Sequence, residues 1–95
     1  MNLTIGDFII IEKYNIPGII TKEINKEKNK DNYKYLVFIY NKHGGYSIEA
    51  NANQIKKTSL EPHEELSIIA NLGDRFYNQY TELYQEILIR CIIYK

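Results

Sequence analysis

The stretch YKYLVFIY, residues 33–40, decides the fold class of this 95-residue chain. It is short and rich in aromatic and β-branched residues, so it predicts a β-strand rather than a helix. Side chains of a strand alternate between its two faces, and neither face of this one is polar. One face carries Leu36, Phe38 and Tyr40, and the other carries Tyr33, Tyr35, Val37 and Ile39. The sequence therefore predicts a strand that is covered on both sides.

Short apolar runs separated by turn residues flank this stretch on both sides. Pro17-Gly18 predicts a turn after the first run, and Asn41–Gly45 predicts a turn after the central strand. Residues 25–32 contain no apolar side chain and predict a solvated loop, while residues 50–54 predict a single helical turn. The predicted strands cover approximately residues 7–14, 19–24, 33–41, 45–50 and 55–58.

The order of these elements resembles a known class of small barrels. A Gly6-Asp7 opener precedes the first strand, Gly18-Ile19-Ile20 opens the second, and a Tyr-x-Val pattern at residues 35–37 marks the third. A short fourth strand, a helical turn and a brief last strand complete a pattern over residues 5–58. It is similar to the SH3-like small barrels of the Tudor and KOW type. The resemblance implies a five-stranded antiparallel barrel that is used for binding and rarely for catalysis.

The last third of the chain changes to a helical period. Apolar residues recur there at spacings of three and four, namely Leu66, Ile69, Leu72, Phe76, Tyr80, Leu83, Tyr84, Ile87 and Cys91. Ser59 or Glu61 is expected to cap the helix, and Pro62 suits its first turn. Gly73 predicts a break, with Asp74 capping a second helix. We therefore expect an amphipathic helix or a kinked helix pair over about 61–92.

The C-terminal residues 87–94 are apolar nearly all round. A surface helix has a polar face, so this end is expected to be buried in the domain, to meet a second chain, or to form a sixth strand. The α+β fold is expected to be one domain over residues 1–95, with a barrel part over 1–60 and a helical part over 61–95 packed on it.

The helical part is expected to cover the outer face of the barrel. Val37 and Ile39 are assigned to that outer face, where water would otherwise reach them, and the helical face of Leu66, Ile69, Phe76 and Tyr80 is its expected cover. Covering a few such side chains contributes several kcal/mol, at about 25 cal/mol per Å². Deleting residues 61–95 is expected to leave an insoluble fragment, and a soluble, folded fragment 1–60 in a solubility and circular dichroism assay would contradict this expectation.

Composition limits the class of protein. The chain is 44% hydrophobic and 25% charged, which is typical of a soluble globular domain. No run approaches the ~20 apolar residues of a transmembrane helix, and a single cysteine excludes an internal disulfide, so the cytoplasm is the expected location. Ile, Asn, Lys and Tyr have AT-rich codons and are abundant, which suggests a low-GC bacterial or phage genome.

The residues capable of catalysis are few. The histidines are His43 in a predicted turn and His63 in the first turn of a predicted helix, and Cys91 lies in an apolar run. They lack the spacing of a zinc site, and Gly44-Gly45 lacks the lysine and helix of a phosphate-binding loop. We expect an exposed His43 and His63, a core thiol at Cys91, no enzymatic activity, and no cofactor or metal.

Two kinds of binding protein fit these observations. The first is a non-catalytic protein-binding module, such as a phage or mobile-element accessory protein that inhibits a host protein by occluding it. Its partner is a protein or a second copy in a homodimer, because tyrosine and apolar residues favour interfaces. The expected interaction residues are Tyr80, Tyr84, Ile87, Leu88, Cys91, Ile92 and Tyr94.

The alternative is a small barrel that binds nucleic acid. Residues 1–60 carry nine lysines against six acidic residues, whereas residues 61–95 carry six acidic residues against two arginines and one lysine. The first part is therefore mildly basic, and its tyrosines could stack on bases. The contacts expected for this alternative are Lys28, Lys30, Tyr33, Lys34, Tyr35, Lys42 and Tyr46. A pI of about 6.7 counts against it, because nucleic-acid domains have a strongly basic face.

Overall fold

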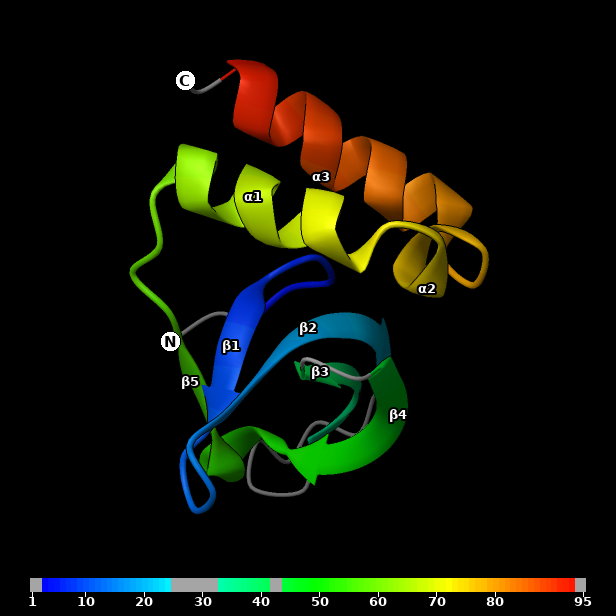
Figure 1. The fold of residues 1–95 in the computed structure, drawn as a ribbon. Coiled ribbons are helices and arrows are strands. Elements are labelled where there is room, and N and C mark those ends of the chain that lie inside the picture. Colours follow the sequence, from blue (N-terminus) through cyan, green and yellow to red (C-terminus); the bar gives the residue numbers. More distant parts are fainter. Residues whose placement is uncertain (1–2, 25–32, 42–43, 94–95) are drawn as a thin grey trace. The chain divides into compact units, whose positions relative to one another are not determined.

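A computed structural model describes residues 3–24, 33–41 and 44–93 (Figure 1). The chain divides into two compact units, Met1–Thr58 with all the strands and Ser59–Lys95 with the α-helices. The boundary agrees with the change of period near residue 60. The grouping of both units into one domain, and the packing of the helices on the sheet, stay predictions. No helix among the described residues is long and apolar enough to cross a membrane.

The first unit is a five-stranded antiparallel sheet, which confirms the predicted strand count and direction. The strands lie in the order β4-β3-β2-β1-β5, and the 3₁₀ turn η2 (Ala52–Gln54) precedes β5. Their bounds are β1 Phe8–Ile11, β2 Ile16–Glu23, β3 Lys34–Asn41, β4 Gly44–Asn51 and β5 Ile55–Lys57. The predicted loop 25–32 and the centre of the predicted turn, Lys42 and His43, lie outside the described residues.

The sheet does not close into the expected barrel. Its two edge strands are β4 and β5, and within the described residues neither pairs with the other. Figure 1 shows β4 curling away from the sheet plane at the right of the view. The predicted number and antiparallel direction of the strands are therefore confirmed, and the predicted closure into a barrel is not.

The first turn lies earlier than the sequence analysis predicted. Residues 12–15 form it, and Asn15 adopts a φ of 53°, which asparagine tolerates better than most residues. The predicted turn at Pro17-Gly18 is wrong, because both residues belong to β2. The β2–β3 pairing begins at Gly18, so the missing N–H of Pro17 removes no hydrogen bond to β3.

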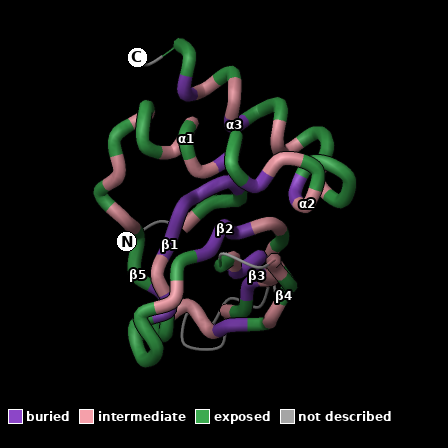
Figure 2. The backbone as a smooth tube through the Cα atoms, viewed as in Figure 1, coloured by how far each residue is buried: buried purple, intermediate pink, exposed green. Residues whose placement is uncertain are grey.

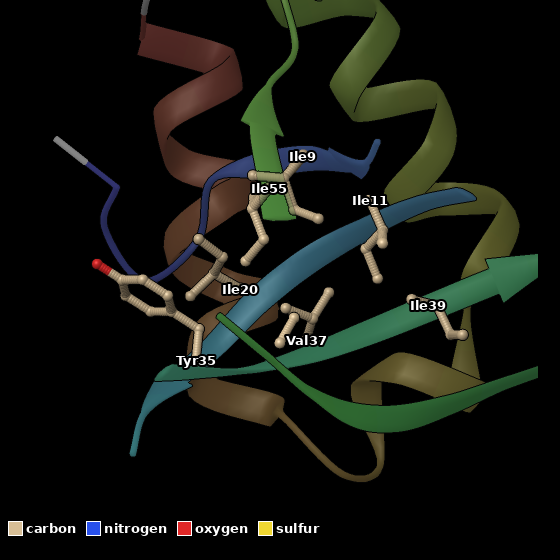
Figure 3. Packing of buried hydrophobic residues seen from close by; sticks show 8 residues of the cluster. Ile9, Ile11, Ile20, Tyr35, Val37, Ile39 and Ile55 are labelled. Atoms are coloured by element: carbon tan, nitrogen blue, oxygen red, sulfur yellow. The ribbon is translucent and has the colours of Figure 1, made fainter. Parts of the chain in front are cut away.

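The sheet has its own apolar core on one face. Ile9, Ile11, Ile20, Val37 and Ile39 lie on that face and are buried (Figures 2 and 3). Tyr35, Ala50 and Ile55 complete the cluster. The assignment of Val37 and Ile39 to the outer wall was wrong, because the sheet curves towards their side. The close-up shows Ile9, Ile11, Ile20 and Ile55 on the same side of the sheet as Val37 and Ile39.

A row of large apolar residues crosses the opposite face. Phe8 lies beside Ile19, and Ile19 lies beside Phe38 on the next strand. All three are buried, and none belongs to the core cluster of the other face. The central strand is thus apolar on both faces, as its sequence predicts.

A β-bulge in β2 changes which face its residues occupy. Ile20 pairs with Val37, but Lys22 pairs with Leu36, so Thr21 is the additional residue between them. The hydroxyl of Thr21 donates a hydrogen bond to the carbonyl oxygen of Leu36 at 3.1 Å. Lys22 consequently lies on the face opposite to the core cluster, where it is exposed.

The second unit contains three helices, α1 Pro62–Leu72, α2 Asp74–Tyr77 and α3 Thr81–Ile93. Pro62 is the first residue of α1, and the Glu64 carboxylate accepts a hydrogen bond from the Glu61 N–H at 3.1 Å, in agreement with the predicted helix start. Gly73 adopts a φ of 51° and separates α1 from α2, as predicted. Asp74 is the first helical residue of α2 and not its cap.

The helices pack together as an antiparallel pair joined by α2. The start of α1 meets the end of α3, where Arg90 forms an ion pair with Glu65 at 3.2 Å. Ile69, Phe76 and Ile87 are fully buried, and residues 78–80 make a second break that was not predicted. Residues 87–93 are helical, so the alternative of a sixth strand is wrong over these residues.

Candidate functional site

An open hollow of about 420 Å³ lies in the first unit, and we call it the Tyr14–Tyr46 hollow. Four isoleucines, Ile11, Ile16, Ile39 and Ile48, supply most of its apolar lining. The other lining residues are Lys13, Tyr14, Tyr46, Glu49, Ala50 and Gln54. The lining comes from β1, the β1–β2 turn, the start of β2, β3, the edge strand β4 and η2.

The β1–β2 turn carries the first aromatic side chain of the site. The N–H of Tyr14 donates to the carbonyl of Ile11, and the N–H of Asn15 donates to that of Glu12, both at 3.3 Å. This turn leaves the Tyr14 side chain 64% exposed, and the Lys13 ammonium lies 5.5 Å from the centre of its ring. Lys13 and Tyr14 together therefore form one side of the hollow, with a positive charge beside an exposed ring.

The edge strand β4 carries the second aromatic side chain. Tyr46 lies opposite Ile39 on the core face of the sheet and is 59% exposed. A smaller hollow of about 170 Å³ lies on its other side, lined by Asn15, Ile16, Pro17, Ile39, Tyr40, Asn41 and Tyr46. Tyr46 thus stands between two hollows that share Ile16 and Ile39 as lining residues.

Two residues of opposite charge are among those that line the larger hollow. Lys13 and Glu49 are both exposed, and Glu49 lies opposite Leu36, on the other parity of β4 from Tyr46 and Ile48. Neither a buried charge nor a cluster of acids accompanies them, so the site provides apolar area with one charge of each sign. Such a surface is suited to holding a ligand by apolar contact and orienting it by charge.

The four described residues among those expected to touch nucleic acid do not form one surface. Tyr35 is buried, and its hydroxyl donates to the carbonyl oxygen of Leu3 at 3.5 Å. Tyr33 packs against Tyr35 with ring centres 5.3 Å apart and donates to the Glu23 carboxylate at 3.2 Å. The pKa of each hydroxyl is raised, mainly by burial and then by neighbouring groups that include Glu23.

The remaining candidates for nucleic-acid contact are separated. Lys34 is exposed at the far end of the β3–β4 pairing from Tyr46, because Lys34 lies opposite Asn51 and Tyr46 lies opposite Ile39. Lys28, Lys30 and Lys42 lie outside the described residues. Of the seven expected contacts, Tyr46 is the one that lines the hollow.

The residues expected to form a protein interface, most of which lie on α3, differ in exposure. Ile87 and Cys91 are buried, Tyr80, Tyr84 and Leu88 are half-buried, Ile92 is 58% exposed, and Tyr94 lies outside the described residues. The exposed apolar face instead consists of Ile89, Ile92 and Ile93, at spacings of three and one along the helix. Residues 87–93 are therefore apolar on two sides of the helix, and Ile89, Ile92 and Ile93 lie on the exposed side.

Cys91 is a buried thiol, as predicted, and we expect it to react slowly. Burial raises the pKa of Cys91, and the nearby Glu65 carboxylate raises it further. The thiolate is the reactive form, so labelling with Ellman's reagent at pH 8 should be about tenfold slower than in the guanidinium-denatured chain. Labelling of the native protein at the denatured rate would contradict this prediction.

The same raised pKa predicts a pH dependence of stability. The contribution of the Cys91 thiol to the free energy of unfolding is fully present below the ordinary thiol pKa. It is lost as the pH rises through the raised pKa of the folded state. Urea denaturation at increasing alkaline pH, compared with Cys91→Ser, checks the sign, because the serine variant lacks this contribution to the slope.

The described residues provide little else for catalysis. His63 is exposed in the first turn of α1, as expected, and His43 lies outside the described residues. No group of three or more histidine, cysteine or acidic residues within residues 3–24, 33–41 and 44–93 is placed to hold a metal ion. Asp7, a buried acid, accepts a hydrogen bond from the Thr4 N–H at 2.9 Å and pairs with Lys57, which indicates a structural role.

Most residues of the hollow were missed by the sequence analysis. Tyr14, Ile16 and Ile48 belong to three different elements, and only the curvature of the sheet brings them together. No local signal marked Tyr14, because the sequence analysis placed it at the end of the predicted strand 7–14 and not in a turn. Comparisons with protein-family models, with curated proteins and with solved structures found no match to this chain.

Proposed function

We propose that this protein is a non-catalytic protein-binding module that holds a segment of a partner protein in the Tyr14–Tyr46 hollow. The observation that carries the proposal is the pair of exposed tyrosines, Tyr14 and Tyr46, on either side of an isoleucine-lined hollow. Tyrosine offers a large, rigid contact area at low entropic cost and is enriched in protein interfaces. Occlusion of a host protein by a phage or mobile-element accessory protein is one role that such a module would serve.

The chemistry of the hollow favours a protein partner over nucleic acid. Four isoleucines line it, and Lys13 is the one cationic residue among its described lining residues. Binding to a phosphate backbone depends on several cationic side chains without acidic neighbours. An apolar side chain of a protein partner is instead held by apolar contacts from which water is excluded. A fluorescent single-stranded oligonucleotide at low salt tests the alternative, and tight binding that weakens steeply with salt would contradict our proposal.

Two tyrosine variants test the proposed site. The full chain is immobilised and the bound proteins of the host cell are quantified against Tyr46→Ala and Tyr14→Ala. Because truncating a central aromatic costs about 2 kcal/mol or more in a typical interface, each variant should reduce retention of the specific partner by more than tenfold. The matched control is Tyr77→Ala, an exposed tyrosine of α2 outside the hollow. Equal retention by all four proteins would exclude the hollow as the site.

Self-association through α3 is a second candidate, because Ile89, Ile92 and Ile93 are 55%, 58% and 67% exposed. A second copy presenting the same face would remove these side chains from water, which yields a homodimer. Ile92→Lys should abolish any concentration-dependent dimer in sedimentation experiments, while Gln85→Lys, an exposed position on the same helix, should not. A wild-type chain that stays monomeric at millimolar concentration would exclude this candidate.

A further inference from the structure

We propose that the partner segment binds as an extended strand that pairs with the outer edge of β4 and places alternate side chains in the Tyr14–Tyr46 hollow. This inference rests on the proposed function and specifies how the same site is used. Three observations carry it: the unequal protection of the two sheet edges, the direction of the backbone groups of β4, and the position of the hollow beside that strand.

The two edges of the sheet differ in how well they are protected against added strands. The edge strand β5 has three residues, of which two are exposed lysines, and both features discourage pairing with another chain. The edge strand β4 has eight residues, contains neither lysine nor proline, and pairs with β3 without a break in register. The long, regular edge is therefore the one that lacks the usual protection.

The hydrogen-bonding pattern indicates which backbone groups of β4 point away from β3. The N–H of Ala52 donates to the carbonyl oxygen of Tyr33 at 2.8 Å, so residues 33 and 52 form a hydrogen-bonded pair. Such pairs alternate along an antiparallel ladder, so Tyr46 and Ile48 face β3 through their backbone, whereas the N–H and C=O of Glu49 point to the outer edge. The N–H of Asn51, which also points outward, donates to the Gln54 side chain at 2.9 Å.

The hollow lies where side chains of an added strand would enter. Tyr46 and Ile48 extend from β4 into it, while Tyr14 and Ile16 line it from the β1–β2 turn and the start of β2. A strand beside β4 presents every second side chain on this face, next to Tyr46 and Ile48. The isoleucine lining thus selects β-branched or other apolar residues at alternate positions of the bound segment.

Charge complementarity specifies the remaining positions. Glu49 lies on the opposite parity of β4 from Tyr46 and Ile48, so a lysine or arginine of the added strand would lie across from it. Lys13 on the far side of the hollow favours an acidic residue at one end of the segment. The partner is therefore a protein with an exposed, extended segment that alternates apolar residues with polar ones and carries both charges.

A synthetic peptide tests the pairing directly. The probe is a peptide of seven residues in which valine alternates with polar residues, namely threonine and lysine, and glutamate is the C-terminal residue. It is titrated into the ¹⁵N-labelled full chain. Amide shifts should change along residues 44–51 and 13–16, and hydrogen exchange of the Glu49 amide should slow by at least about tenfold, since pairing protects that N–H. Saturable shifts confined to any other region, or an unprotected Glu49 amide in the saturated complex, would overturn the inference.

Three variants separate the edge from the hollow. Glu49→Pro removes the outward N–H without removing a bond to β3, and Glu49→Gln is the matched control that keeps this N–H but loses the charge. We expect binding weaker by tenfold or more for Glu49→Pro and by a few fold for Glu49→Gln. If Tyr46→Ala abolishes peptide binding while Glu49→Pro leaves it unchanged, strand pairing is wrong and the hollow remains the site.

The remaining outcomes also decide the question. If neither Tyr46→Ala nor Glu49→Pro affects peptide binding, both the proposed function and this inference are wrong. If the labelled chain broadens with concentration and Glu49→Pro restores sharp spectra without peptide, β4 pairs with a second copy, and the inference of a partner segment is overturned. If Glu49→Pro fails to fold, the hydrogen exchange of the Glu49 amide in the wild-type chain, measured with and without the peptide, tests the strand pairing instead.

Discussion

Phe76→Ala is expected to destabilise the helical unit by about 3–5 kcal/mol, the range typical of a fully buried phenylalanine. Phe76 has no exposed surface, and its ring lies 5.1 Å from that of Tyr80 and 6.4 Å from that of Tyr84. Removing the ring leaves a cavity and deprives two tyrosines of their aromatic partner. A loss of this size is comparable with the whole stability of a small domain.

Urea denaturation followed by circular dichroism at 222 nm measures this effect. Tyr77→Ala is the matched control, because the next residue of α2 is exposed and contacts Tyr84 edge-on at 5.2 Å. We expect it to cost about 1 kcal/mol, the value of one aromatic pair. Equal losses for both variants would show that Phe76 is not the central side chain of the helical cluster.

Gly18→Ala is expected to destabilise the sheet by about 1–3 kcal/mol, the usual cost of overpacking a core. A Cβ atom at residue 18 would lie 2.6 Å from Cγ1 of Val37, 3.0 Å from the carbonyl oxygen of Phe38 and 3.2 Å from Cγ2 of Ile39. Val37 is fully buried and cannot move aside, and the backbone oxygen cannot move without disturbing the β2–β3 pairing. Glycine is therefore required here for close approach and not for an unusual φ.

A glycine of the edge strand β4 offers a control of the same chemistry. A Cβ atom at Gly44 would meet no atom within 4 Å, so Gly44→Ala should be neutral or should stabilise the protein by a few tenths of a kcal/mol through the unfolded state. The two alanine variants are compared by urea denaturation monitored by tyrosine fluorescence. Similar midpoints for both would contradict the steric argument at Gly18.

The sequence predicted the elements that depend on local patterns. The apolar stretch at residues 33–40 supplies most of β3, an interior strand of the sheet. The spacing of Ile69, Phe76 and Ile87 predicted a buried helical face. Gly73 ended α1 where it was expected to, because its positive φ disfavours other residues. Each of these predictions rests on the period of apolar residues or on the conformational freedom of a single residue.

The errors concern curvature and steric environment, which local patterns do not contain. Pro17-Gly18 has the composition of a turn, but the side chains of Val37 and Ile39 require glycine at that place in a strand. Val37 and Ile39 were assigned to the outer face because the alternation of side chains along a strand separates the two faces of the sheet. It does not indicate which of the two faces is concave. Barrel closure depends on pairing between the first and last parts of a sheet, and no residue pattern near β4 or β5 reports it.

The candidate site was predictable only in its chemistry. The abundance of tyrosine led us to expect a binding surface. Tyr46 was among the residues named, as a contact for the alternative of nucleic-acid binding. Tyr14 and Tyr46 are 32 positions apart and meet through the sheet curvature, which one sequence does not reveal. The exposed side of α3 was equally hidden, because residues 87–93 are apolar on the buried side as well.

The bulge at Thr21 lets β2 carry one extra residue without changing the pairing of the residues that follow it. If Thr21 instead paired with Leu36 in a regular ladder, Lys22 would lie opposite Tyr35 and extend its ammonium group among Ile20, Val37 and their neighbours, at the cost of a buried charge. Replacing Thr21 by another residue loses one side-chain hydrogen bond, whereas deleting it removes the bulge and leaves Lys22 opposite Leu36 and Glu23 opposite Tyr35. Descendants of this sequence should therefore vary in residue type at this position, and even lose the residue, while Lys22 keeps its place on the exposed face.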